Sequence, residues 1–88
     1  MEYEEAKRLA AAGSDSQRRA LAASNDVRPE ILYFLAEDKS ADVRRAIAGN
    51  EATPRQADLL LARDSDLSVR ELLAQKIARL APQLSQET

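Results

Sequence analysis

A short motif that begins with arginine occurs three times in this chain, at a fixed interval of 26 residues. It reads RRALA at 18–22, RRAIA at 44–48 and RELLA at 70–74, and the sequence LA-x-D at 35–38 returns at 61–64 with the same interval. A fixed period of roughly 20 to 50 residues indicates stacked copies of one supersecondary unit. A single copy cannot bury its apolar face alone, so the chain is expected to fold by packing each copy against the next.

The composition predicts that these units are helical. The chain has 88 residues, of which 44% are hydrophobic and only 3% aromatic, so its core must consist mainly of Ala, Leu, Ile and Val. Ala and Leu are the strongest helix formers, and β-branched residues are few. We therefore expect one all-α domain, since a chain of this length suffices for a single modest core.

Helix starts recur with the same period. Ser14, Ser40 and Asp66 are separated by the same interval as the motif, and each can accept a backbone N–H at a helix N-terminus. Gln17 completes a capping box with Ser14. Two further starts are predicted at Thr53-Pro54, with Thr53 as the cap, and more weakly at Asp26 with Pro29.

Helix ends are predicted where Gly or Asn can adopt a left-handed conformation and where Pro blocks continuation. These ends fall at Gly13, Ser24-Asn25, Gly49-Asn50 and Pro82. Together with the starts they predict helices at 3–12, 15–24, 28–38, 41–49, 54–64 and 67–81. Such short helices are marginal in isolation and need packing against neighbours, with antiparallel pairs as the default arrangement.

Apolar residues follow the helical period within these segments. Val43, Ala46 and Ile47 share one face of their helix, and a later helix repeats the pattern. The later set is Val69, Leu72, Leu73, Ile77 and Leu80. Tyr33 and Phe34, with their counterparts Leu59 and Leu60, are expected to pack between helices; the alternative is an exposed apolar docking patch.

The segment from Val43 to Pro54 resembles a known helical repeat. It reads VRRAIAGNEATP, similar to the leucine-rich repeat variant, and the Asp38-x4-Val43-Arg44 and Asp64-x4-Val69-Arg70 patterns resemble HEAT-like repeats. The resemblance covers about residues 14–80 and implies a right-handed α-solenoid of short antiparallel helix pairs, with about 26 residues per repeat. The chain also resembles the N-terminal region of a bacterial helical-repeat family of unknown function, whose members are usually longer.

The repeat boundaries divide the single domain, 1–88, into five parts. We expect an N-terminal half-repeat at 1–13, two full repeats, a capping half-repeat and a tail, at 14–39, 40–65, 66–82 and 83–88. The third copy departs from the repeat where Gln75-Lys76-Ile77 replaces the loop, which favours a C-terminal cap. Some leucine-rich repeat variant proteins carry a cysteine-ligated iron–sulfur cluster, but this chain has no cysteine.

Two aspartate–arginine pairs are candidates for a structural ladder: Asp38 with Arg44, and Asp64 with Arg70. An aspartate in the turn can accept N–H groups of the following helix, while an arginine one turn later reaches back or onward to the next repeat. A periodic residue usually serves something that every repeat needs. The alternative reading of the same residues is an anion site.

The next register predicts a partner-binding face. Arg19, Arg45 and Glu71 should point away from the core, and Gln75 lies one turn after Glu71 in line with the small residues Ala23 and Gly49. Arginines there could bind carboxylates or phosphates, and small neighbours would allow close approach of a partner. The alternative is an ordinary solvated helix face.

The sequence lacks most of the residue types that catalytic sites commonly use. The chain lacks His and Cys and has only two glycines, so the usual general base, thiolate ligands and phosphate-binding loop are missing. Acid–base or cation-binding roles for the glutamates Glu4, Glu5, Glu30 and Glu37 have no supporting motif. We expect no enzyme activity, no cofactor and no catalytic or metal site.

The leading functional hypothesis is a non-catalytic protein-interaction module or small scaffold, either alone or as the N-terminal part of a longer protein. The alternative is binding of a nucleic-acid phosphate backbone through an arginine-lined face, against which a net charge of −2 argues mildly. Self-association through the solenoid ends is a third hypothesis. The N-terminal sequence has no signal-peptide pattern and no apolar run is long enough to span a bilayer, so a cytoplasmic location without membrane contact is expected.

Overall fold

The fold is entirely helical over the part of the chain that is described. A computed structural model describes residues 1–86, with side chains through residue 81. Within residues 1–86 there are six helices and no strand, which confirms the all-α class and the number of helices. The helices are α1 (Tyr3–Ala12), α2 (Asp15–Ala22), α3 (Pro29–Leu35), α4 (Ala41–Gly49), α5 (Arg55–Leu61) and α6 (Leu67–Gln86).

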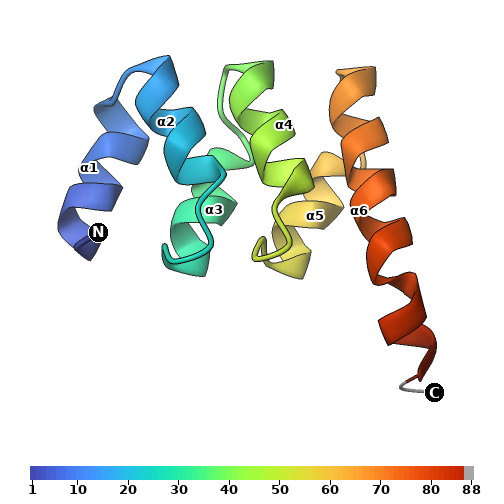
Figure 1. Cartoon of the computed structure of the whole chain (residues 1–88). Coiled ribbons are helices and arrows are strands. Elements are labelled where there is room, and N and C mark those ends of the chain that lie inside the picture. The colour runs from blue at the N-terminus through green and yellow to red at the C-terminus, as the bar shows by residue number, and fades with distance from the viewer. Residues whose placement is uncertain (87–88) are drawn as a thin grey trace.

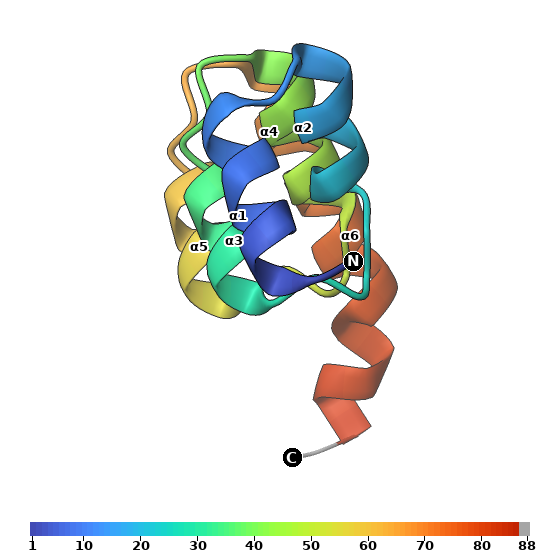
Figure 2. The ribbon, with the colours of Figure 1, turned by 90° about the vertical axis from the view of Figure 1, so that its left-hand side faces the viewer.

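The six helices form two layers. Figure 1 shows α2, α4 and α6 side by side in chain order, with α3 and α5 behind them. The view along the row in Figure 2 places α1, α3 and α5 in one layer and α2, α4 and α6 in the other. Helix α4 packs on both α2 and α6, and α3 packs on both α1 and α5. Helices α1 and α6 therefore lie at opposite ends of a body measuring 40 × 27 × 17 Å.

The three helix starts that recur with the repeat are capped as predicted. Ser14 Oγ accepts the Gln17 amide at 3.2 Å while Gln17 Oε1 accepts the Ser14 amide at 2.8 Å, which is a complete capping box. Ser40 Oγ accepts the Val43 amide at 3.4 Å. Asp66 Oδ1 accepts the Ser68 amide at 2.8 Å. These short polar side chains satisfy backbone donors that no intrahelical carbonyl can reach.

The other two predicted starts were wrong in detail. Pro54, not Thr53, is the N-cap of α5, and the buried Thr53 hydroxyl donates to the Ile47 carbonyl at 2.9 Å instead. Pro29 is the first residue of α3 as predicted, but Asp26 does not cap that helix. The Asp26 carboxylate accepts a hydrogen bond from the nearby Ser24 hydroxyl.

Three helices end earlier than predicted because their last turns tighten. Helix α2 ends at Ala22 rather than 24, α3 at Leu35 rather than 38, and α5 at Leu61 rather than 64. After α3, the amides of Glu37 and Asp38 bond to carbonyls only three residues earlier. This 3₁₀-type geometry satisfies the last carbonyls and turns the aspartate out of the helix.

Two further expectations about helix ends are corrected. Gly13 follows α1 as predicted, but its φ is −72°, and no residue in the part of the chain described has a positive φ. The left-handed helix stop therefore does not occur there. Helix α6 continues through Pro82 to Gln86, so most of the expected tail at 83–88 is helical. A Pro inside a helix removes one backbone hydrogen bond without always ending it. Residues 87–88 of that tail lie outside the described residues.

The core repeats with the sequence. Leu21, Ile47 and Leu73 occupy equivalent positions and are 3%, 0% and 4% exposed. Val43 and Val69 are also fully buried. The expected inward face of α6 is wrong at one position, since Ile77 is 48% exposed while Lys76 is buried. None of the described helices combines the length and apolar character needed to cross a bilayer.

Candidate functional site

Arginine–aspartate pairs connect each repeat to the next. Arg18 Nε lies 2.7 Å from Asp38 Oδ2 and its Nη2 lies 3.3 Å from Oδ1, while Nη1 donates to the Gly13 carbonyl. Arg44 makes the same fork with Asp64 at 2.7 and 3.4 Å, and its Nη1 donates to the Asp38 carbonyl at 2.7 Å. Each arginine thus joins the turn before its own helix to the turn one repeat later. We call this set the arginine–aspartate ladder.

The aspartates of the ladder also hold the start of the following helix. Asp38 Oδ1 accepts the Ser40 amide and Asp64 Oδ1 accepts the Asp66 amide, both at 2.9 Å. Burial raises the pKa of Asp38, but the hydrogen bonds from Arg18 and the Ser40 amide outweigh it and bring that pKa below its ordinary value. The same hydrogen bond with Asp38 raises the pKa of Arg18. The pair is therefore ionised, and its two opposite charges meet in a mostly buried contact.

The third arginine of the ladder has only half of this arrangement. Arg70 Nη1 donates to the Asp64 carbonyl at 2.5 Å, which repeats the backward contact of Arg44. The described residues place no carboxylate on its guanidinium, and its side chain is exposed. The ladder is thus closed at two levels and open at α6.

Arg44 reaches in both directions that the sequence analysis left open, back to the Asp38 carbonyl and onward to the Asp64 carboxylate. Asp38 takes its ion pair from Arg18 of the preceding repeat, and Arg44 contacts only the backbone of Asp38. Sequence reasoning missed Arg18 as a ladder residue. The signal was present, because Arg18, Arg44 and Arg70 are evenly spaced by one repeat.

A second contact between repeats follows the turns at the other end of the helices. Asn50 Nδ2 donates to the carbonyls of Ala22 and Ser24, the latter in the equivalent turn of the preceding repeat. Lys76, one repeat after Asn50, donates through Nζ to the Asn50 carbonyl at 3.0 Å and to Asp58 Oδ1 at 2.6 Å. Lys76 therefore takes over the role of Asn50 from within α6, where the earlier repeats have a turn.

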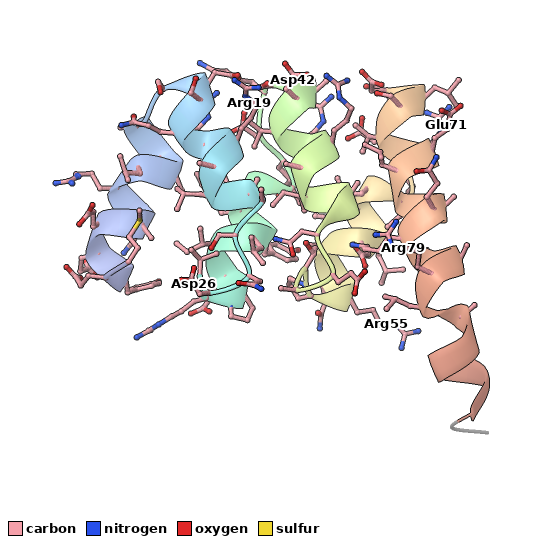
Figure 3. All side chains as sticks on the ribbon, in the orientation of Figure 1. Arg19, Asp26, Asp42, Arg55, Glu71 and Arg79 are labelled. Carbon is pink, nitrogen blue, oxygen red and sulfur yellow. The ribbon has the colours of Figure 1, made fainter. Side chains whose placement is uncertain are left out.

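The predicted partner-binding face is found along the edge of one layer. Figure 3 shows Arg19 and Glu71 near the same ends of α2 and α6, with Asp42 between them on α4. Arg19, Glu71 and Gln75 are exposed. Arg45 is not free, because it pairs with Asp42 and donates to Ser68 Oγ at 2.9 Å. Arg19 also has a carboxylate partner, Asp15 at 3.1 Å.

Four large apolar side chains are exposed in the other layer, on α3 and α5. Tyr33, Phe34, Leu59 and Leu60 are 41%, 55%, 61% and 38% exposed, so the expectation that they pack between helices was wrong. The physical reason is that each short helix has only one inward face, which is already occupied. In α3 that face belongs to Ile31, Leu32 and Leu35, the first at 3% exposure and the others at 0%. We call these four exposed residues the outer apolar row.

Shallow hollows flank the outer apolar row. One, of about 250 Å³, lies between α1 and α3 and is lined by Phe34, Ile31 and Tyr3, among others. Another, of about 270 Å³, lies beside Tyr33 and is lined by Pro29, Glu30 and Pro54. The row thus presents projecting side chains next to apolar depressions, a surface suited to contact with another protein.

The described part of the chain contains no cluster of carboxylates suited to a metal ion. No group of three or more Asp or Glu side chains in residues 1–86 is placed to hold a metal ion. The carboxylates at the repeat contacts, including Asp38, Asp58 and Asp64, are engaged by arginine or lysine side chains.

Comparisons with known proteins identify no relative. The chain matches no family model, no curated protein and no solved structure. The resemblance to HEAT-like and leucine-rich repeat variant units therefore stays a prediction from the sequence.

Proposed function

We propose that this chain is a small, right-handed α-solenoid of HEAT-like type that serves as a protein-interaction module. The fixed sequence period, the two helical layers and the recurring arginine–aspartate contacts support the architecture. Extended surfaces made of equivalent helices are what such arrays provide for binding.

The outer apolar row is the observation that carries the interaction proposal. Four large apolar side chains stand exposed on two adjacent helices at two equivalent positions of the repeat. Scattered apolar residues on a surface are ordinary, but aromatic and leucine side chains exposed on two helices that pack together, next to depressions, are typical of an interface. Aromatic side chains also contribute strongly to binding when a partner removes them from water.

Nucleic-acid binding has weaker support. Arg19 and Arg45 of the predicted arginine face are paired with Asp15 and Asp42. These pairs offset the positive potential that a phosphate backbone requires, and the chain carries a net charge of −2. The protein reading therefore leads, with the outer apolar row in place of Arg19, Arg45, Glu71 and Gln75 as the main contact surface.

Affinity capture from a lysate of the source cell tests this proposal. The baits are the immobilised wild type, a Phe34→Ser/Leu60→Ser variant and a matched Arg19→Glu/Arg45→Glu variant from the other layer. Each bait is used with and without nuclease treatment, and bound proteins are identified by mass spectrometry. We expect proteins that the wild type and the arginine variant retain and the Phe34→Ser/Leu60→Ser variant loses.

Two results would contradict the proposal. If the arginine variant alone loses its partners, the binding face lies on α2 and α4. If retention disappears with nuclease, or if labelled RNA or DNA binds with a steep dependence on salt concentration, the nucleic-acid reading replaces it.

A further inference from the structure

The end of the molecule formed by α5 and α6 exposes residues whose counterparts are buried one repeat earlier. Ala36 and Ala48 are 3% and 0% exposed, because α5 packs on α3 and α6 packs on α4. Their counterparts in the next repeat, Ala62 and Ala74, are both exposed. Both positions are alanine, which is small enough for close helix contact, yet no helix of residues 1–86 covers them.

Helix α6 presents a continuous stripe at this end. Leu67, Arg70, Ala74 and Ile77 follow the i, i+3, i+7, i+10 spacing that places residues on one side of a helix. Leu67 is 59% and Ile77 48% exposed, although both are large and apolar. Figure 1 shows α6 as the last helix of its layer, with α4 on one side and no helix on the other. We call Ala62 and these four residues of α6 the C-terminal end face.

Arg70 gives this face a defined charge requirement. Arg18 and Arg44 place the same guanidinium atoms, Nε and Nη2, on an aspartate of the following unit. Arg70 already makes the backward contact to the Asp64 carbonyl, which positions its guanidinium in the same way. The donors Nε and Nη2 are left for an acceptor from outside.

The molecule also shows what kind of segment fits such a face. The two segments that cover an earlier end share an apolar residue, a second one four residues later, and an aspartate seven residues after the first. The apolar residues are at most 3% exposed, and the aspartates accept hydrogen bonds from the ladder arginines. The two sets are Ile31, Leu35, Asp38 and Ala57, Leu61, Asp64.

We propose that the C-terminal end face binds a helical segment of another protein with this pattern. Its two apolar side chains pack on the end face beside Ala62, as α5 packs on α3 beside Ala36, and its aspartate just beyond the helix accepts hydrogen bonds from Arg70 Nε and Nη2. This docking surface is distinct from the outer apolar row, because it lies at the end of the array and selects for a carboxylate. Charge complementarity and the two internal examples identify the occupant as a short amphipathic helix ending in aspartate.

A second copy of this chain does not supply that segment from its surface. Its α3 and α5 segments are buried in its own array. At the equivalent positions of α1 the chain has Glu5, Leu9 and Ala12, which lack the first apolar residue and the aspartate. Stacking α1 on this face would bury Glu5 without a partner there, which costs free energy.

The probe is a fluorescein-labelled peptide with the sequence of residues 53–66, cross-linked on its solvent side to hold it helical. Fluorescence anisotropy measures its binding to the full chain. We expect Arg70→Gln to weaken binding about tenfold, as loss of a charge-assisted contact does. Changing the peptide residue equivalent to Asp64 to Asn should weaken it equally, and the two changes together should cause no further loss. Arg8→Gln, at the opposite end, and Phe34→Ser should leave binding unchanged.

Three outcomes would overturn the proposal. The first is that the peptide does not bind the wild type even at the highest protein concentration of the titration. The second is equal binding to the wild type and to both the Arg70→Gln and Ala74→Arg variants, which would place the peptide elsewhere. The third is a dimer in sedimentation velocity that Ala74→Arg dissolves, which would make a second copy the occupant. Failure of the lysate test with Phe34→Ser/Leu60→Ser would leave these results unaffected.

Discussion

The two ends of the molecule face water in different ways. At the N-terminal end, Gln17 occupies the position where the later repeats have Val43 and Val69, both fully buried. At the C-terminal end, Ala62 and Ala74 keep the residue type of the interior although they are exposed. The first end has polar replacements at interior positions, whereas the second retains an interior surface.

This difference indicates which neighbouring unit each residue contacts. Gln17 is polar and exposed where Val43 and Val69 are buried, and it lies on α2, the first helix of its layer within residues 1–86. Positions that contact the following unit, including Arg70, have not changed in the last copy. Exposed apolar surface is costly to keep without a use, which is why the C-terminal end face supports a docking proposal. Four predictions test this contrast.

The largest effect should separate the interior from the C-terminal end. Ile47→Ala should lower the free energy of unfolding by about 2–5 kcal/mol, because it leaves a cavity at a fully buried site. Ile77→Ala should change it by less than about 0.5 kcal/mol, because the side chain is half exposed. Urea denaturation followed by circular dichroism measures both. Equal losses would mean that α6 is rotated relative to its position here.

Two equivalent arginines should differ in the same way. Arg44→Gln should cost about 1–3 kcal/mol, because Asp64, whose side chain is 7% exposed, loses its charged partner. Arg70→Gln should cost less than about 0.5 kcal/mol, since no carboxylate contacts it in the described part of the chain. The comparison uses thermal unfolding at one pH and ionic strength. A large loss from Arg70→Gln would show that the ladder is already closed at α6.

The N-terminal end should depend on the capping box of α2. Ser14→Ala removes the acceptor for the Gln17 amide and should cost about 1 kcal/mol. Ser16→Ala, in the first turn of the same helix, is the control and should be nearly neutral. Chemical denaturation distinguishes the two, and a neutral Ser14→Ala would indicate that water replaces the cap without loss.

Acid should weaken the ladder in a direction that the pKa of Asp38 determines. Its folded pKa lies below its ordinary value, so the unfolded chain binds more protons as the pH falls below about 4. Stability is therefore present above the unfolded pKa and is lost as the pH falls through the folded one. Asp38→Asn should flatten this dependence of the urea midpoint between about pH 5 and pH 2. An unchanged slope would assign the acid sensitivity to other carboxylates.

Much of the fold was readable in the sequence because it depends on local properties. The fixed period, the helix-forming composition and the caps at Ser14, Ser40 and Asp66 are set by neighbours close along the chain. Helix ends were less readable. The early ends of α2, α3 and α5 depend on tight last turns, and the left-handed stops expected at Gly and Asn do not occur in the described chain.

The candidate sites depended on tertiary packing. Tyr33 and Phe34 have the composition of a core, yet they are exposed because Ile31, Leu32 and Leu35 fill the only inward face. Lys76 looks like a surface residue, yet it is 1% exposed because a carbonyl and Asp58 receive its charge. Likewise, the sequence left open whether each ladder arginine reaches back or onward, and the stacking of repeats gives the Asp38 carboxylate to Arg18.

By itself, the sequence determined that this protein is a set of similar helical units, since helix formation and capping are short-range. Only the tertiary structure decided which copy of each repeated residue is covered. Arg18, Arg44 and Arg70 occupy equivalent positions of the repeated motif. Their surroundings differ because an aspartate-bearing turn follows the first two within the described chain and not the third.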